Sequence, residues 1–380
     1  MEEVIKTKKG LFIRIHKSFG AIVFSPYSGL FFAIKEEYVD KTIQFCEGKK
    51  VSLDNEIIRH LEIGINKEEE IFEVKHYLPN SEQFHKDNVF PPFPIVINWL
   101  ISNKCNCKCN YCYADDVIDH DFDEASIEET VQKILELNPL AVVISGGEPF
   151  MVKEKLRKAI ELLGDKVGLI VDTNGLLWDD SIIELMQKYN VVVRISIDEI
   201  RHKVNSKTRV VRDKKVNDVA LQTINENMLK YVALKIPVLV HTVVTSYNKK
   251  SLPDLAKGLP AMGVNGWRLF SVIRPNNKSK EIFDKVMNYR NDANYDNQIK
   301  DIKLDLDDLK RKFPSKSNFS IEIVPTNESS KNSVVMVLPN GKLVTESLFE
   351  NQKMVISKDE IFANVNPWGH YERYLGKIKI

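Results

Sequence analysis

Between residues 95 and 272 the chain alternates apolar runs with amphipathic segments of helical periodicity. The apolar runs predict β-strands at residues 95–102, 141–145, 167–172, 191–197, 238–245 and 267–272. The segments between them predict helices at residues 124–137, 153–163, 180–189, 219–234 and 252–262. Strands that are apolar throughout and alternate with helices are typical of a parallel sheet buried on both faces. With right-handed crossovers, the pattern predicts an α/β fold, a partial (β/α)6 TIM-like barrel.

Polar residues or glycines follow the predicted strands. The segments concerned are residues 103–114, 145–149, 172–175, 196–198 and 245–248, and the sixth strand ends near Arg274. Barrel enzymes carry their chemistry at the carboxyl ends of the strands. We therefore expect the functional side chains, and the ligands that they bind, to gather at this end of the barrel.

The region before the barrel predicts a small module of strands followed by helices. Residues 11–34 read as three short strands with turns, and helical periodicity follows at residues 37–46 and 54–61. We assign residues 1–75 to this module. Residues 76–94 are expected to be a linker, because three prolines close to its end cannot continue a helix or pair in a central strand.

The remaining chain divides into the barrel, at residues 95–275, and a C-terminal α/β extension at residues 276–380. In the extension, residues 319–324 and 334–338 predict strands. The sequence Pro339-Asn340-Gly341 after them predicts a β-hairpin.

Composition excludes some classes of partner. With 54 basic and 53 acidic side chains the formal net charge is +1, so no global field favours nucleic acid or an anionic membrane. The first residues lack the apolar core of a signal peptide, and no apolar run approaches the roughly 18 residues that cross a bilayer. We expect a cytoplasmic protein with reduced thiols and without nucleic-acid or membrane partners.

Four of the five cysteines lie within eight residues, directly after the first barrel strand. A structural zinc site needs a second pair of ligands further along the chain, and none exists. A thioredoxin-like dithiol fits Cys109 and Cys112 but leaves Cys105 unexplained. Three thiolates with the spacing Cys105-x3-Cys109-x2-Cys112 can instead ligate three irons of a [4Fe-4S] cluster and leave the fourth iron open. Cys107 does not fit this pattern and is expected to be a bystander.

This spacing, with the aromatic Tyr111 just before the last cysteine, resembles the signature of the radical S-adenosylmethionine (SAM) superfamily. The resemblance implies that SAM chelates the open iron through its amino and carboxylate groups. It also implies that an electron from the cluster cleaves SAM to a 5'-deoxyadenosyl radical. Gly146-Gly147-Glu148, at the end of the second strand, is similar to the family's Gly-Gly-Glu motif, whose backbone and acid hold the SAM amino group.

The same resemblance implies roles for four other residues at strand ends. Ser196 and Asp198 resemble a polar pair that contacts the SAM carboxylate or the ribose hydroxyls, and Asn174 lies where related enzymes line the same cavity. Arg209 has nearly the spacing of an arginine that pairs with the SAM carboxylate, although Arg201 and Arg212 compete with it. We also considered Asn248 and Arg268 as side chains that could face the cavity.

The resemblance implies an enzyme of the peptide-maturase-like branch, which includes the anaerobic sulfatase maturases. Its substrate would be a short ribosomally made precursor peptide, and its electron donor a flavodoxin or ferredoxin. Residues 1–75 resemble the winged-helix module to which such peptides add a strand. No cysteine follows Cys112, which rules out cysteine-ligated auxiliary clusters in the extension. Two alternatives stay open: a radical SAM enzyme acting on a folded protein or small metabolite, and a non-catalytic iron–sulfur sensor or assembly protein.

Overall fold

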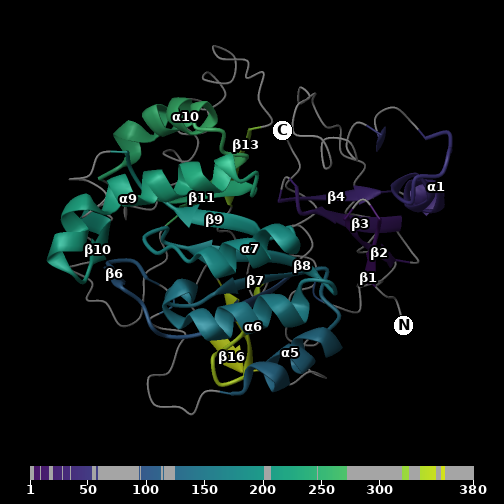
Figure 1. Cartoon of the computed structure of the whole chain (residues 1–380), viewed down its shortest axis with the longest axis horizontal. Coiled ribbons are helices and arrows are strands. Elements are labelled where there is room, and N and C mark those ends of the chain that lie inside the picture. Colours follow the sequence, from purple (N-terminus) through teal and green to yellow (C-terminus); the bar gives the residue numbers. More distant parts are fainter. Residues whose placement is uncertain are drawn as a thin grey trace.

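Figure 1 shows the computed structural model of the chain, in which a curved sheet with a layer of helices lies beside a smaller N-terminal sheet. The structure describes residues 4–8, 10–16, 20–27, 29–34, 36–53, 57–58, 94, 96–112, 114, 125–200, 207–245, 247–271, 319–324, 334–347 and 352–355. The predicted linker at residues 76–94, except Pro94, and the predicted helix at residues 54–61, except residues 57–58, lie outside these ranges. No helix among the described residues is long and apolar enough to cross a membrane.

All six predicted barrel strands are present and parallel. They are β5 (Val96–Leu100), β7 (Ala141–Ser145), β8 (Gly168–Thr173), β9 (Val192–Ser196), β11 (Val238–Val244) and β12 (Gly266–Ser271). Within the sheet they lie side by side in chain order. The partial α/β barrel predicted from the hydrophobic pattern is thus confirmed.

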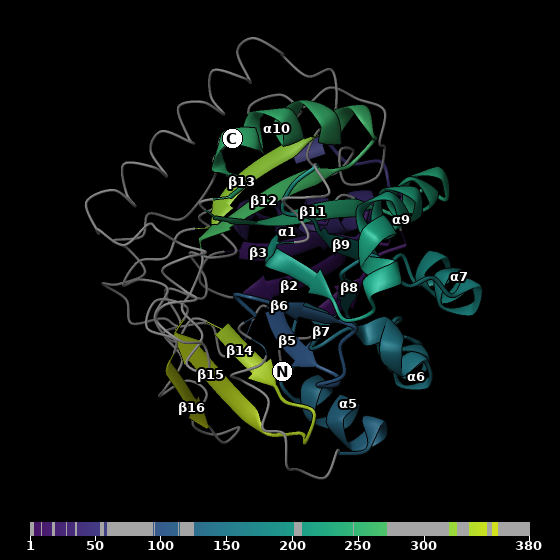
Figure 2. The same ribbon diagram turned by 90° about the vertical axis from the view of Figure 1, so that its left-hand side faces the viewer.

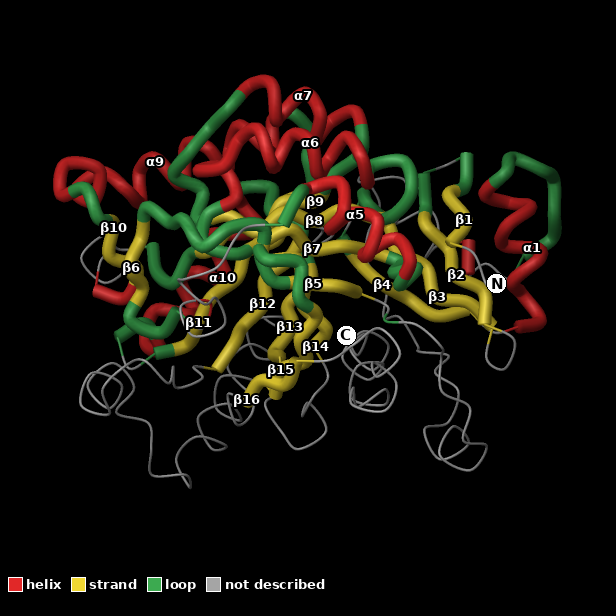
Figure 3. The backbone as a smooth tube through the Cα atoms, turned by 90° about the horizontal axis from the view of Figure 1, so that it is seen from below, coloured by secondary structure: helices red, strands yellow, loops and turns green. Residues whose placement is uncertain are grey.

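Five of the described helices follow these strands in the chain and lie along the outer side of the curved sheet, as Figures 2 and 3 show together. They are α5 (Ile127–Glu136), α6 (Lys153–Leu163), α7 (Asp180–Lys188), α9 (Lys214–Ala233) and α10 (Leu252–Ala261). Three of them start at a side chain that accepts a main-chain N–H of the first turn, namely Ser126, Asp179 and Asp213. Helix α9 starts before the predicted residue 219 because the Asp213 cap stabilises an earlier first turn.

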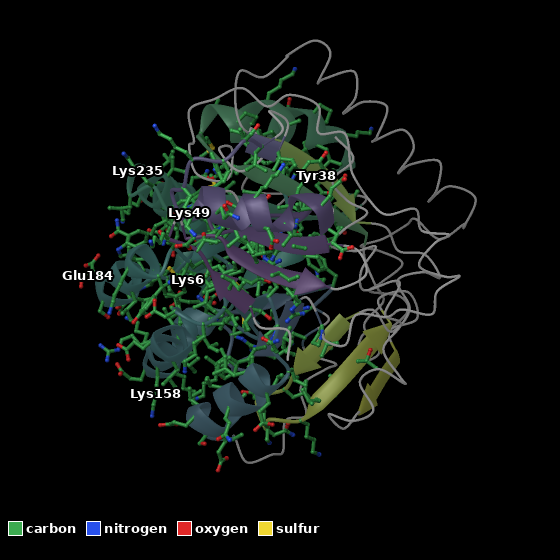
Figure 4. All side chains as sticks on the ribbon, turned by 90° about the vertical axis from the view of Figure 1, so that its right-hand side faces the viewer. Lys6, Tyr38, Lys49, Lys158, Glu184 and Lys235 are labelled. Carbon is green, nitrogen blue, oxygen red and sulfur yellow. The ribbon has the colours of Figure 1, made fainter. Side chains whose placement is uncertain are left out.

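The helices bury their apolar faces against the sheet and expose their polar faces. Buried side chains such as Ile144, Leu156 and Ile195 belong to one apolar cluster between the strands and the helices. On the outer surface, the labelled side chains of Lys158 and Glu184 project away from α6 and α7, as Figure 4 shows. This is the division expected of amphipathic helices around a central sheet.

The C-terminal strands join the barrel sheet. β13 (Ser320–Val324) pairs in parallel with β12 at one edge, and β14 (Val334–Val337) pairs in parallel with β5 at the other. β15 (Leu343–Ser347) and β16 (Gln352–Val355) continue antiparallel from β14, which confirms the predicted hairpin. Figure 2 shows the resulting sheet curving from β13 round to β16. The sequence pattern did not predict that the extension completes the barrel sheet, and the domain boundary at residue 275 stays a prediction.

The N-terminal module is an antiparallel sheet in the order β1-β2-β3-β4 with one described helix of regular length, α1 (Glu36–Cys46). The three predicted strands are confirmed as β2 (Phe12–His16), β3 (Gly20–Ser25) and β4 (Leu30–Ile34). The additional strand β1 (Val4–Lys6) is too short and too polar to give an alternating pattern.

Both faces of this N-terminal sheet are covered. One face packs with α1 through side chains that include Ile13, Val23 and Val39. On the other face, Phe12, Ile22 and Phe24 pack against barrel residues that include Val143, Ile170, Val192 and Leu239. These four residues lie in the amino-terminal or middle parts of their strands, so the N-terminal sheet closes this end of the barrel, which we call the barrel floor.

Candidate active site

The segment of four cysteines follows β5 and contains a strand that the sequence pattern did not predict. β6 (Cys107–Cys109) pairs antiparallel with β10 (Arg209–Val211), with Cys109 opposite Arg209. Figures 1 and 3 show this β6–β10 ribbon at the opposite end of the barrel strands from the N-terminal sheet. The cysteine segment therefore lies at the carboxyl end of the barrel, where the sequence pattern placed it.

Main-chain hydrogen bonds extend the β6–β10 ribbon beyond both strands. The N–H of Asn110 donates to the carbonyl of Thr208 at 3.0 Å, and the N–H of Arg212 donates to the carbonyl of Asn106 at 2.9 Å. The Arg212 guanidinium also donates through Nε to the carbonyl of Cys105 at 3.0 Å. The segment after β9 is thus attached along the length of the cysteine segment.

The cysteines differ in burial. Cys107 is buried, whereas Cys105, Cys109 and Cys112 are partly exposed, and no disulfide joins any of the five cysteines of the chain. Asn174 Nδ2 donates to the Cys107 sulfur at 3.5 Å. Burial raises the pKa of the Cys109 thiol to about 12. The hydrogen bond with Cys105, together with burial, raises the pKa of Cys107 well above its usual range.

Gly146 and Gly147 bring the end of β7 into contact with the start of the cysteine segment. A Cβ at Gly146, whose φ is +126°, would lie 2.4 Å from the carbonyl oxygen of Ser102, and one at Gly147 would lie 2.2 Å from that of Lys104. The N–H of Gly147 donates to Ser102 O at 2.8 Å and that of Glu148 to Lys104 O at 2.7 Å. The main chain before Cys105 thus occupies the space that a side chain would need at these two positions.

The Glu148 side chain is buried at the end of β7. Its carboxylate accepts hydrogen bonds from Thr173 Oγ1 at 2.8 Å, from the N–H of Asn174 at 2.7 Å and from the N–H of Phe150 at 3.1 Å. Burial raises the pKa of Glu148 to about 7, although these three donors partly offset that increase. The negative charge of a Cys105 thiolate contributes to this rise.

Asn174 links the Glu148 turn to the cysteine segment. Its N–H binds Glu148, and its side-chain Nδ2 donates to Asn106 Oδ1 at 2.6 Å. The structure therefore brings together three of the segments that sequence reasoning selected: the cysteine segment, the Gly-Gly-Glu turn and the end of β8. Ser196 ends β9 on the inner face of the barrel, in register with His241 of β11.

Asp198 is fully buried, and its carboxylate is directed at groups of the protein. It accepts from Thr208 Oγ1 at 2.9 Å, from the N–H of Val243 at 3.0 Å and from the Tyr111 hydroxyl. The Arg209 Nε lies 3.1 Å from Oδ2 in an ion pair. Sequence reasoning expected Asp198 to touch SAM, but it did not foresee this set of internal partners.

The competing candidates are placed less favourably. Arg201 lies outside the described residues, and Arg212 is tied to the main chain of Cys105. Asn248 is buried and donates through Nδ2 to the carbonyls of Asp198 and Val243, each at 2.8 Å, so its role is structural. Arg268 lies on β12 in register with His241, on the inner face of the barrel.

A family model places this site in a known group. Residues 99–258, from the end of β5 into helix α10, match the model of the radical SAM superfamily. The chain carries a radical SAM domain. It is a radical SAM enzyme, whose cofactors are a [4Fe-4S] cluster and SAM.

Characterised relatives of this radical SAM enzyme act on different substrates. The chain is 24% identical over 298 residues to a S-adenosylmethionine-dependent nucleotide dehydratase of Fibrobacter sp. strain UWH6, covering 72% of this chain and 85% of the relative. It is 30% identical over 109 residues to the sporulation killing factor maturation protein SkfB of Bacillus subtilis strain 168, covering 28% and 26%.

Solved structures share the fold. The crystal structure of Streptococcus suis SuiB bound to SAM superposes with a TM-score of 0.58 at 13% identity, covering 89% of this chain and 82% of SuiB. SuiB has also been solved with its precursor peptide SuiA, with a TM-score of 0.56. At this level of sequence identity, the superposition shows only that SuiB and this chain share a fold.

The described residues fit the two cofactors. No three His, Cys, Asp or Glu side chains in the described part of the chain converge closely enough for a single metal ion. A [4Fe-4S] cluster needs a different arrangement of ligands from a single metal ion, because each of three thiolates binds a separate iron. Ser145 Oγ is buried at the end of β7 and makes no hydrogen bond within the described part of the chain. Such a buried polar atom is typical of a site that a polar ligand completes.

Proposed function

We propose that Cys105, Cys109 and Cys112 ligate the [4Fe-4S] cluster of this radical SAM enzyme. The three thiols share one segment at the carboxyl end of the barrel, and they are more exposed than Cys107. The ribbon pairing holds this segment in place, while the Gly146-Gly147 turn supports its start. Cluster binding releases the thiol protons, since only thiolates ligate iron.

We propose that the residues around the cluster bind SAM. The Gly146-Gly147-Glu148 turn and Asn174 face its amino group, and Ser196, Tyr111 and Arg209 line the rest of the SAM site, with Asp198 behind them. When bound, the cluster would supply one electron, received from a cytoplasmic flavodoxin- or ferredoxin-type donor, for the reductive cleavage of SAM. The protein binds the reactants and keeps water from the site.

The observation that carries this proposal is the spatial grouping of the cysteine segment with the Glu148 turn. The test is anaerobic reconstitution with iron and sulfide, followed by addition of dithionite and SAM. We expect 5'-deoxyadenosine and methionine in equal amounts. A reconstituted protein that carries the cluster and binds SAM but releases no 5'-deoxyadenosine would contradict the proposed activity.

We propose a short ribosomally made precursor peptide as the substrate, bound by strand addition to the N-terminal sheet. A strand adds through main-chain hydrogen bonds to an edge strand, and among the described strands the edges of this sheet are β1 and β4. β1 has three residues, and its Lys6 forms an ion pair with Asp165 of the barrel at 2.9 Å. β4 has five residues and is the edge that suits a peptide better. SuiB and SkfB, which handle peptides, support this choice.

Amide hydrogen exchange tests the peptide hypothesis without any substitution. The probe is a synthetic peptide encoded by a short reading frame beside the gene of this enzyme. Binding by strand addition should slow the exchange of the β4 amides at residues 30–34 and leave those of α5 unchanged. Binding that leaves the β4 amides unchanged would rule out strand addition at this edge.

A small polar metabolite is the second candidate substrate, and the inner face of the barrel favours it. Asp172 and Arg194, paired in register on β8 and β9, form an ion pair with Nη2 and Oδ2 2.6 Å apart. His241 and Arg268 lie in register on β11 and β12. The alternation of the strands puts these side chains on the same face as the floor residues Ile170, Val192 and Leu239.

Charged groups inside a barrel cost desolvation free energy, so they indicate a polar ligand more readily than they explain stability. The nucleotide dehydratase relative supports a substrate of this kind. Assays of the reconstituted enzyme with each of the four ribonucleoside triphosphates separate the candidates. A nucleotide that is consumed together with SAM would replace the peptide hypothesis, and an absence of consumption with all four would remove the nucleotide version of the second candidate.

A further inference from the structure

We infer that Asp198 is a positioning residue that sets the place of the cysteine segment through Tyr111 and the β6–β10 ribbon, and that it does not itself contact SAM. This inference rests on the proposed function, in which the cysteine segment binds the cluster. It assigns a role to contacts that sequence reasoning did not foresee.

Donors of the protein itself occupy the Asp198 carboxylate. Its Oδ2 accepts from the hydroxyls of Tyr111 and Thr208, and its Oδ1 accepts from the N–H of Val243 and lies 3.3 Å from Arg209 Nη2. A carboxylate has about four acceptor positions, so these donors use them. Little capacity is left for a ribose hydroxyl or the SAM amino group.

The groups that donate to Asp198 come from different segments of the chain. Tyr111 belongs to the cysteine segment, Thr208 and Arg209 to the segment that forms β10, and Val243 to β11. Asp198 itself follows β9 and is anchored through its carbonyl by Asn248. One buried carboxylate thus connects the cysteine segment to two barrel strands and to the partner strand of β6.

Arg209 lies next to both Tyr111 and the cysteine segment. Its guanidinium lies 5.4 Å from the centre of the Tyr111 ring, and residue 209 is opposite Cys109 in the ribbon. The negative charge of Asp198 stabilises the guanidinium in this place. Through Arg209 and Tyr111, the single charge of Asp198 acts on residues that adjoin two of the proposed cluster ligands, Cys109 and Cys112.

The test compares two substitutions with a matched control. Tyr111→Phe removes one hydroxyl that donates to Asp198 and keeps the aromatic ring, and Asp198→Asn removes the charge. Tyr231→Phe is the control, because Tyr231 is also buried but its hydroxyl has no hydrogen-bond partner in the described structure.

Two measurements separate positioning from direct contact. The first is amide exchange at residues 107–109 and 209–211 in cluster-free protein, where Tyr111→Phe should speed exchange by about tenfold or more, since a hydrogen bond to a charged group is lost. Asp198→Asn should have the larger effect. The second is the SAM concentration that half-saturates the change in the electron paramagnetic resonance spectrum of the reduced cluster, which should rise in the same order.

The two measurements together can support or contradict the positioning role of Asp198. Faster exchange in the ribbon together with weaker SAM binding, both absent in Tyr231→Phe, supports the positioning role. Weaker SAM binding with unchanged ribbon exchange would show that Asp198 contacts SAM directly and would overturn it. Wild-type behaviour of Tyr111→Phe in both measurements would also overturn it, even if Asp198→Asn fails to fold.

Failure of the proposed function looks different from failure of this inference. Wild-type protein that produces no 5'-deoxyadenosine would contradict the proposed function. The exchange measurement uses cluster-free protein and reads the ribbon itself, so its result stands independently of the reaction.

Discussion

The two ends of the barrel strands are built on opposite principles. At the floor, aromatic and aliphatic side chains of the N-terminal sheet pack directly on barrel side chains, and Gly168 leaves room for the Phe24 ring. At the carboxyl end, the turns meet through main-chain hydrogen bonds and buried carboxylates that include Glu148 and Asp198. The floor supplies stability, whereas the opposite end holds polar groups in place for chemistry.

This difference has a physical reason. Apolar burial is non-directional and tolerates small shifts, so it suits a surface whose only task is to exclude water. Buried carboxylates are costly unless their hydrogen bonds are satisfied, and satisfied networks define one arrangement. The comparison predicts that substitutions at the floor change the free energy of unfolding more than cofactor binding, and that substitutions at the carboxyl end do the reverse.

The largest effect is expected from replacing the proposed cluster ligands. Cys105→Ala, Cys109→Ala and Cys112→Ala should each abolish the incorporation of a stable [4Fe-4S] cluster and reduce 5'-deoxyadenosine formation below detection, because each removes one iron ligand. Cys107→Ala is the matched control in the same segment and should retain the cluster. Iron and sulfide content after anaerobic reconstitution measures the result. Loss of the cluster in the Cys107 variant alone would reverse the assignment.

At the floor, Phe24→Ala should lower the free energy of unfolding by about 3 to 5 kcal/mol, the usual cost of truncating a buried phenylalanine. Urea unfolding measures it. Cluster content after reconstitution at low temperature should stay at the wild-type level, because the floor lies at the far end of the strands from the cysteines.

A double substitution sharpens this test. A Cβ at Gly168 would lie 2.2 Å from the Phe24 ring, so Gly168→Ala alone should destabilise the protein. In the Phe24→Ala background the same change should cost far less, since the ring is gone. Additive effects of the two substitutions would show that the N-terminal sheet does not pack on the floor as described.

Sequence patterns predicted the floor strands and the site segments well, for an identifiable reason. Runs such as residues 141–144 are apolar throughout, and the polar residues and glycines after them mark their ends. The three-residue strands β1, β6 and β10 were missed, because so short a run carries no period. The pairing of β13 and β14 with the edges of the barrel depends on contacts between distant segments, which no local pattern encodes.

The site was predictable in its residue types but not in its internal contacts. The strand pattern predicted that the cysteine segment and the Gly-Gly-Glu turn lie at the carboxyl end of the barrel, and they lie there in the structure. In the structure, Gly146 and Gly147 allow the main chain of Ser102 and Lys104 to approach closely. The Asp198 carboxylate accepts hydrogen bonds from the hydroxyls of Tyr111 and Thr208. Such contacts depend on how two loops meet. The only signal in the sequence for the buried Asp198 carboxylate is that a buried Tyr111 hydroxyl needs a hydrogen-bond acceptor.

At the carboxyl end, Glu148 should make stability depend on pH in cluster-free protein. The unfolded-state pKa is near the ordinary 4.5 and the folded-state pKa is about 7, so between these values the folded protein holds a proton that the unfolded chain loses. Stability therefore falls as pH rises through this window, by up to about 3 kcal/mol at roughly 1.4 kcal/mol per pKa unit.

Glu148→Gln isolates this contribution, because glutamine is of similar shape and does not titrate. The free energy of urea unfolding is measured for both proteins at about pH 5 and about pH 8. We expect wild type to lose more stability than the variant on going to the higher pH. Equal changes in the two proteins would show that Glu148 ionises normally in the fold.

The smallest effect is expected in the β6–β10 ribbon at Val210, whose side chain is 38% exposed. Because residues 110 and 208 form a hydrogen-bonded pair, alternation along the antiparallel ribbon makes Val210 and Lys108 another. Val210→Pro removes that N–H and should destabilise the ribbon by about 1 kcal/mol or more. Val210→Ala keeps the N–H and is the matched control.

Unlike the floor substitutions, Val210→Pro should weaken SAM binding while leaving the midpoint of urea unfolding nearly unchanged, because Val210 itself belongs to neither of the apolar clusters that Val143 and Ile144 represent. The measurements are amide exchange at residues 107–109 and half-saturation by SAM. If the proline variant unfolds at much lower urea concentration than the alanine variant, the carboxyl end contributes to global stability as the floor does. The division between a stabilising end and a positioning end would then fail.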